Sequence, residues 1–193
     1  SDFGRAVVKE MNRVGVIVDI AHSGWQTSLE AAQTSEKPIV ASHTTCDALY
    51  HHIRAKPDEV IKTIADKEGY ISICCIPRFL GGAGNIGDML RHIDYVAKTF
   101  GPDYVGIGTD VPAQSQYNAE EAELIPPYRK ARIRWEALWP EDPFKETREM
   151  RLSMAWTNWP LFTVGLVQLG YSDDDIQKII GGNALRVFQA NQT

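Results

Sequence analysis

Three residues with metal-ligand chemistry each end a short apolar run of the sequence. His22 follows the run 16–21, His43 ends the run that Pro38 opens, and Asp110 ends the run that begins at Tyr104. A buried parallel strand reads as a continuous Val- and Ile-rich segment of about 4–8 residues. Because reactive side chains gather at the carboxyl ends of parallel strands, we expect these three residues to lie together.

Imidazole and carboxylate groups are the ligand set of zinc-type centres in hydrolases. A metal ion held at this edge would lower the pKa of its water toward ~7 and supply hydroxide at neutral pH. Asp110 would then ligate the metal, accept the proton of the water, or do both in sequence. A lone histidine at a strand end is more often a structural residue, but three such groups at one edge favour a metal site.

Arg54 lies in the loop after the second apolar run, at the same predicted edge. Its planar guanidinium is suited to bidentate binding of a carboxylate. The alternative reading is an ordinary surface arginine.

Alternating helical and strand patterns connect these residues. The sequence predicts strands over 16–21, 38–43, 70–76 and 104–110, and helices over 3–13, 25–34, 57–69 and 89–100. A mostly helical segment over 144–169 and two short helices after Ser172 complete the chain. Such alternation predicts an α/β fold with a parallel sheet and right-handed crossovers.

Composition excludes several classes of protein. With 193 residues, 44% of them hydrophobic, and a net charge of −5, the chain reads as one soluble domain without a surface for nucleic acid. Its cysteines, Cys46, Cys74 and Cys75, read as buried free thiols. No apolar stretch reaches the ~20 residues that span a membrane, and the start of the chain does not read as a signal peptide. The long polar segment 111–142 reads as a lid or binding insertion.

With these residues placed, the chain resembles the carboxyl-terminal part of the membrane (renal) dipeptidase family of metal-dependent amidohydrolases. The segments that carry the resemblance are 4–13, 18–22, 42–43, 54 with 57–60, 92–96, the motif Gly106-Ile107-Gly108-Thr109-Asp110, 170–172 and 182–188. They cover nearly the whole chain except the 111–142 insertion.

The resemblance implies a fold and a set of roles. It implies strands five to eight of a (β/α)8 barrel that uses two zinc ions to hydrolyse dipeptides, some with a D-residue at the carboxyl terminus. By resemblance His22 and His43 hold the second zinc, Asp110 serves the first zinc and handles the proton, and Arg54 binds the carboxylate of the substrate.

The chain also departs from that family pattern. The first zinc needs a His-x-Asp pair from strand one and a bridging glutamate, and no predicted strand end here carries either. A complete barrel takes ~250 residues, and four strands leave two unpaired edges. We therefore expect a fragment, completed by an amino-terminal half in the same longer chain or in a second polypeptide. Alone it should bind at most one metal weakly and be nearly inactive.

Two other functions stay open on the sequence. An amidohydrolase site could act on another amide, a lactone or an ester, including a phosphoester. A half-barrel could also serve as a non-catalytic binding module. A homodimer is a further possibility, with the tryptophan-rich region 135–162 as its candidate contact.

Overall fold

The computed structural model describes residues 1–111 and 143–192. It divides into two compact units, one formed by 1–110 with 146–193 and the other by 111–145. All candidate site residues belong to the first unit. The predicted insertion 111–142 lies, except for Val111, outside the described residues. Within 1–111 and 143–192, no helix combines the length and apolarity needed to cross a bilayer.

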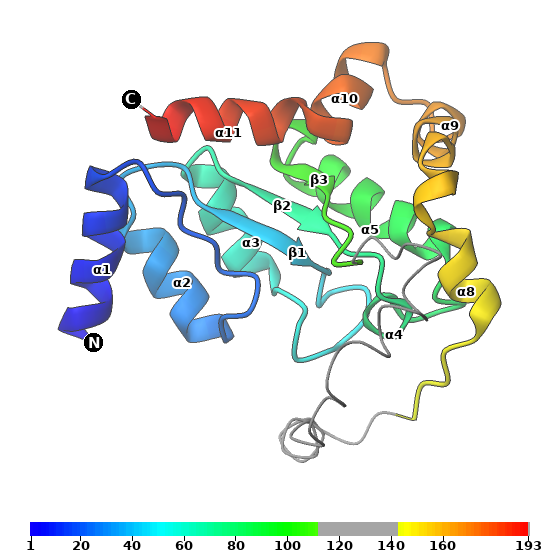
Figure 1. Cartoon of the computed structure of the whole chain (residues 1–193), viewed down its shortest axis with the longest axis horizontal. Helices are drawn as coiled ribbons and strands as arrows, with labels where there is room; N and C mark the ends of the chain where they lie inside the picture. The colour runs from blue at the N-terminus through cyan, green and yellow to red at the C-terminus, as the bar shows by residue number, and fades with distance from the viewer. Residues whose placement is uncertain (112–142, 193) are drawn as a thin grey trace, which may run out of the picture. The chain divides into compact units, whose positions relative to one another are not determined.

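A parallel sheet in the order β1-β2-β3 forms the centre of the first unit (Figure 1). Its strands are β1 (Val40–Thr44), β2 (Tyr70–Ile73) and β3 (Val105–Ile107). Val40 pairs with Tyr70, and Ile71 pairs with Val105. Because the strands are parallel, their carboxyl ends meet at one edge, as the predicted α/β fold requires.

The predicted first strand is wrong in its extent. Residues 16–21 run beside β1, but only Asp19 forms a bridge, with Val40. The backbone N–H of Ile20 donates to the Val40 carbonyl, and the N–H of Val40 donates to the Val18 carbonyl. In the described part of the chain this segment has β1 on one side only, so its ladder is short. It nevertheless delivers His22 to the same edge as β1.

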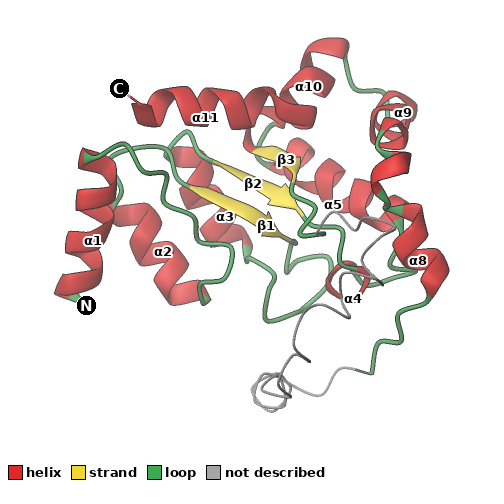
Figure 2. Cartoon of the chain, in the orientation of Figure 1, coloured by secondary structure: helices red, strands yellow, loops and turns green. Residues whose placement is uncertain are grey.

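Helices connect and cover the strands (Figure 2). They are α1 (Asp2–Arg13), α2 (Trp25–Thr34), α3 (Asp58–Asp66), α4 (Pro77–Leu80), α5 (Ile86–Thr99), η1 (Pro102–Tyr104), α8 (Arg148–Ser153), η2 (Trp156–Asn158), α9 (Pro160–Gln168), α10 (Asp173–Gln177), the π-helical turn η3 (Lys178–Gly182) and α11 (Asn183–Gln192). Helices α3, α5 and α11 contact the sheet directly. The predicted 144–169 helical segment consists of two helices, α8 and α9, with the 3-10 turn η2 between them.

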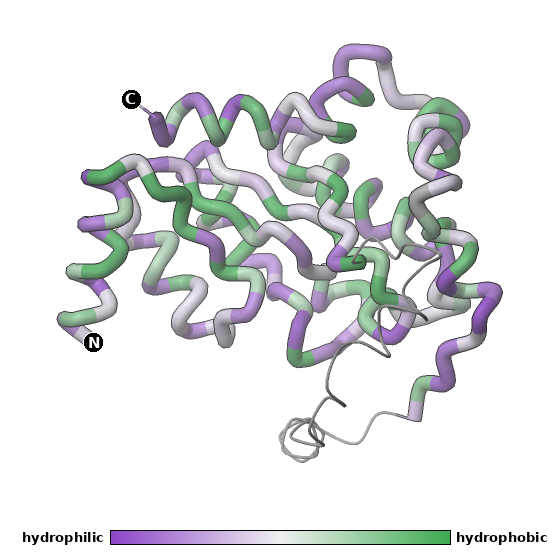
Figure 3. The backbone as a smooth tube through the Cα atoms, in the orientation of Figure 1, coloured by the Kyte–Doolittle hydropathy of each residue, from purple (hydrophilic) through white to green (hydrophobic). Residues whose placement is uncertain are grey.

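The core lies between the strands and these helices. Ile71 and Ile73 of β2 are fully buried, as are Ile64 of α3 and Ile93 of α5. Figure 3 shows hydrophobic stretches along the segments that form the sheet. Burial of such side chains stabilises the fold by about 1.5–3 kcal/mol each, so packing fixes the strands whose ends carry the site.

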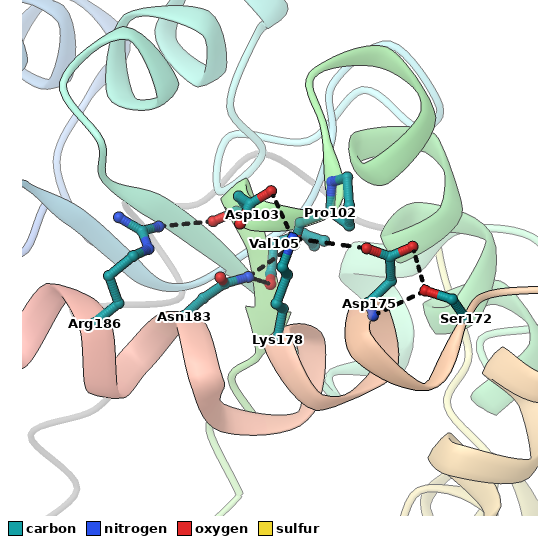
Figure 4. Close-up of polar contacts among 8 residues, drawn as sticks. All are labelled: Pro102, Asp103, Val105, Ser172, Asp175, Lys178, Asn183 and Arg186. Carbon is teal, nitrogen blue, oxygen red and sulfur yellow. Dashed lines mark hydrogen bonds and ion pairs between the residues drawn. The ribbon is translucent and has the colours of Figure 1, made fainter.

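The carboxyl-terminal helix holds the start of β3 in place (Figure 4). The buried side-chain amide of Asn183 donates to the carbonyls of Pro102 and Val105, at 2.8 and 2.9 Å. Arg186 donates to the Asp103 carbonyl at 2.8 Å. Because Asp110 follows the other end of β3, this clamp also supports the position of Asp110.

His92 of α5 joins three elements in the core. Its Nδ1 accepts a hydrogen bond from the Cys46 N–H at 3.1 Å, and its Nε2 donates to the Leu80 carbonyl at 3.0 Å. The side chain is fully buried. Burial lowers the pKa of His92 below its ordinary value, against the opposing hydrogen bond to the Leu80 carbonyl, while the charge of Arg91 lowers the pKa and that of Asp88 raises it.

A loss of stability in acid is expected from His92. Its folded-state pKa is lowered, so its contribution is complete above the unfolded pKa of ~6.5 and is lost as the pH falls toward the folded value. Urea unfolding at about pH 7.5 and about pH 5.5 should show this loss in the wild type. His92→Asn retains an acceptor without the titration and should reduce the difference. A variant that keeps the full pH difference would exclude His92 as its source.

Candidate metal centre

His22 and His43 meet at the carboxyl edge of the sheet. His43 lies within β1, and His22 follows the segment that bridges to β1. Their Nε2 atoms are 2.8 Å apart, with the ring planes inclined by 64°. Two imidazole nitrogens that converge in this way can serve as ligands of one metal ion.

Asp110 reaches the same place from β3. Its Oδ1 lies 3.8 Å from the Nε2 of His43. The backbone φ of Asp110 is +55°, in the left-handed region that residues other than glycine rarely adopt. Residues held in such conformations cluster at functional sites. The structure thus brings together His22, His43 and Asp110, the three residues expected at the carboxyl ends of the parallel strands.

Arg54 is buried beside this pair of histidines. Its guanidinium Nη2 is 3.4 Å from the Ala21 carbonyl, and its Cζ lies 5.4 Å from the ring centroid of Phe79. The buried Nε has no hydrogen-bond partner among the described residues. A buried cation with an unused donor is costly unless an anion binds it. The alternative reading of Arg54 as an exposed surface residue is wrong, because only 9% of it is exposed.

The electrostatics favour the form of His22 that binds metals. Burial lowers the pKa of His22, and the nearby Arg54 and His43 lower it further, against the opposing charges of Asp110 and Asp19. A lowered pKa leaves more imidazole neutral near pH 7, and the neutral ring is the ligand form.

The two imidazoles can supply two ligands of a metal ion, but they do not form a complete ligand set. Within residues 1–111 and 143–192, no group of three or more His, Cys, Asp and Glu side chains is close enough to hold a metal. His92 and Asp94 have His-x-Asp spacing, but they lie on α5. His92 is engaged in the core, and Asp94 accepts from Tyr171 and Lys98. A complete centre would need ligands beyond these residues.

Three polar residues around the histidines were missed by the sequence reasoning. Asp19 and Ser42 form a hydrogen-bonded chain with His43. Lys56, only 1% exposed, donates to the Ser23 carbonyl and the Ser28 hydroxyl, at 2.5 and 2.9 Å. Burial lowers the pKa of Lys56 to about 8. Polar residues inside apolar strand runs were the available signal for Asp19 and Ser42.

Comparison with known proteins shows which family this chain is similar to. The family model of membrane dipeptidase (peptidase family M19) matches residues 1–123. Among curated proteins, dipeptidase aclJ of Aspergillus oryzae is 27% identical over 97% of this chain and 38% of its own length. Dipeptidase tcpJ of Claviceps purpurea is 25% identical over 96% of this chain and 37% of its own length. The chain thus spans under two fifths of these relatives.

Solved structures share the fold. An amidohydrolase from Pseudomonas aeruginosa superposes with a TM-score of 0.76 at 30% identity, over all of this chain and 57% of that one. A metallopeptidase from Rhodobacter sphaeroides, liganded with a phosphinate mimic of the dipeptide L-Ala-D-Ala, superposes at 0.72 and 21% identity, over 99% of this chain and 47% of that one.

The family model covers well over half of the sequence and includes every residue of the site described above. This chain therefore belongs to the membrane dipeptidase family, peptidase family M19.

Proposed function

We propose that this chain supplies half of the active site of a zinc-dependent dipeptidase. The observation that carries the proposal is the pair of Nε2 atoms, 2.8 Å apart, beside the buried guanidinium of Arg54. His22 and His43 would hold one of two zinc ions, and Asp110 would serve the other. Membership of peptidase family M19 and the dipeptidase relatives support this assignment.

The remaining ligands would come from a second half of the barrel. We propose that residues 1–193 form one domain, strands five to eight of a (β/α)8 barrel, with 111–142 as an insertion. The relatives support this, because each is much longer than the segment that matches. The amino-terminal half, in the same longer protein or in a second polypeptide, would complete the first zinc site.

The described residues divide the proposed reaction between them. Zinc, when bound, supplies a water whose pKa is lowered toward ~7. Arg54 binds the carboxylate of the dipeptide and so fixes which peptide bond faces the edge of the sheet. Asp110 accepts the proton of the attacking water and delivers it to the leaving amine. The imidazoles of His22 and His43 hold their positions throughout.

Replacing Arg54 with methionine tests the substrate class. R54M keeps the length and apolar packing but removes the charge, so kcat/KM for a dipeptide should fall by about 30-fold, or ~2 kcal/mol. Most of the change should be in KM. The measurement uses the full-length protein with zinc and a panel of L,L and L,D dipeptides that includes L-Ala-D-Ala, because the Rhodobacter structure holds a mimic of it.

Two comparisons make that result specific. Arg5→Met removes an exposed arginine that pairs with Glu30 on α2, and it should leave kcat/KM unchanged. The wild type should prefer a dipeptide over its carboxamide, and R54M should lose that preference. Equal cleavage of both by the wild type would favour an amidohydrolase with another substrate. No cleavage of any dipeptide would refute the proposed function.

A further inference from the structure

We propose that Asp19 and Ser42 are positioning residues that hold His43 in the tautomer whose Nε2 is unprotonated. The role of this tautomer, to present a ligand nitrogen to zinc, rests on the proposed function. The tautomer itself rests only on hydrogen bonds between residues of this chain.

The direction of each hydrogen bond follows from the groups involved. The Ser42 Oγ is 2.5 Å from the Asp19 Oδ2, and an ionised carboxylate can only accept. The single hydroxyl proton of Ser42 therefore points to Asp19. The Oγ is also 2.8 Å from the Nδ1 of His43, so in this second bond Ser42 must accept and Nδ1–H must donate. In a neutral imidazole the Nε2 is then unprotonated.

Backbone donors fix the carboxylate that sets this direction. The Oδ1 of Asp19 accepts from the N–H of Ala21 and from the N–H of Ser42, each at 3.0 Å. The hydrogen bond from the Ile20 N–H to the Val40 carbonyl holds the two segments at this separation. Oδ2 is thus left facing the Ser42 hydroxyl. The hydrogen bonds that link His43, Ser42 and Asp19 therefore all run in one direction, from the Nδ1–H of His43 toward the Asp19 carboxylate.

That polarity suits a ligand. A metal-bound histidine commonly donates its other ring N–H to a fixed acceptor, which orients the ring and raises its basicity. Here the acceptor is a serine hydroxyl backed by a carboxylate. The Nε2 of His43 is directed to the Nε2 of His22, where the second ligand of the same ion would lie.

The variant Asp19→Asn should reverse the direction of the hydrogen bonds between residue 19, Ser42 and His43. Because both backbone N–H groups bond the Oδ1 position, the amide oxygen should remain there and the NH2 should face Ser42. The amide then donates to the Ser42 Oγ, the hydroxyl donates to Nδ1, and the proton of His43 moves to Nε2. Nitrogen NMR of the metal-free, full-length protein should show this change of tautomer. Affinity for zinc alone should fall by about 10–100-fold.

Ser42→Ala is the control that separates this relay from a structural role. It removes the intermediary, so His43 should populate both tautomers and zinc affinity should fall less than in D19N. In the double variant D19N/S42A there is no hydroxyl between the asparagine and His43, so the asparagine cannot change the tautomer. The affinity for zinc should therefore return to that of S42A. Thermal unfolding of each variant checks that the fold persists, and S42A alone still tests the acceptor if D19N does not fold.

The outcomes decide between two ideas. An unchanged Nδ1–H tautomer in D19N, or a double variant as weak as D19N, would overturn the relay. A wild type that shows the Nδ1–H tautomer but binds no zinc would support the relay and overturn the proposed metal site.

Discussion

Replacing Asp110, the proposed proton acceptor, with asparagine is expected to lower kcat for the proposed dipeptide hydrolysis by about 10²–10⁴-fold, the range that general acid–base groups contribute. The amide has the shape of the carboxylate but cannot accept the proton of water. Asparagine also tolerates the left-handed backbone, here φ +55°, so the turn after β3 should persist. The measurement compares kcat and KM of the full-length protein at saturating zinc.

Asp66→Asn provides the matched control for this substitution. Asp66 lies at the end of α3 and pairs with Lys62 in an exposed ion pair. Such pairs contribute about 0–1 kcal/mol, so D66N should keep the wild-type kcat. A decrease of less than about tenfold in D110N would assign proton transfer to another group.

The helices could be predicted well because their signals are local. Helix α2 spans Trp25–Thr34, as predicted, and α1 begins one residue earlier than expected. Strands were less predictable, since a strand needs a neighbour. The apolar run 16–21 has the composition of a strand, but only Asp19 pairs as a bridge. Predicted strand 70–76 shortens to Tyr70–Ile73 for the same reason, where its regular pairing ends.

The placement of the candidate site residues was predictable to the extent that it follows from strand ends. His22, His43 and Asp110 were selected because parallel strands bring their carboxyl ends together, and the structure places them so. Asp19 and Ser42 were not selected, because their link crosses 23 positions of sequence and depends on the register between two segments. The burial of Lys56 depends on three-dimensional packing in the same way.

Gly108 is the position where packing and chemistry can be separated. Its backbone lies so close to β1 that an added Cβ would be 1.9 Å from the Ser42 carbonyl oxygen and 2.6 Å from the Ser72 Cβ. Neither obstacle is the end of a flexible side chain. Gly108→Ala must therefore displace the end of β3 from the end of β1, and with it Asp110 from His43.

G108A is expected to lower the unfolding free energy by about 1–3 kcal/mol, as overpacking does, and kcat/KM by about 10²-fold through misplacement of the site. Gly24→Ala is the control, because its Cβ would meet nothing within 4 Å and its φ is −62°. That variant should keep the kcat/KM of the wild type and lose at most about 1 kcal/mol of unfolding free energy, because Gly24 is the N-cap of α2 and alanine caps less well. Urea unfolding measures the free energy of unfolding of both variants, and steady-state kinetics measure their kcat/KM.

If G108A matched G24A in both measurements, close approach of the strand ends would not be required. If G108A lost activity and stability while D110N lost only activity, the first effect would be geometric and the second chemical.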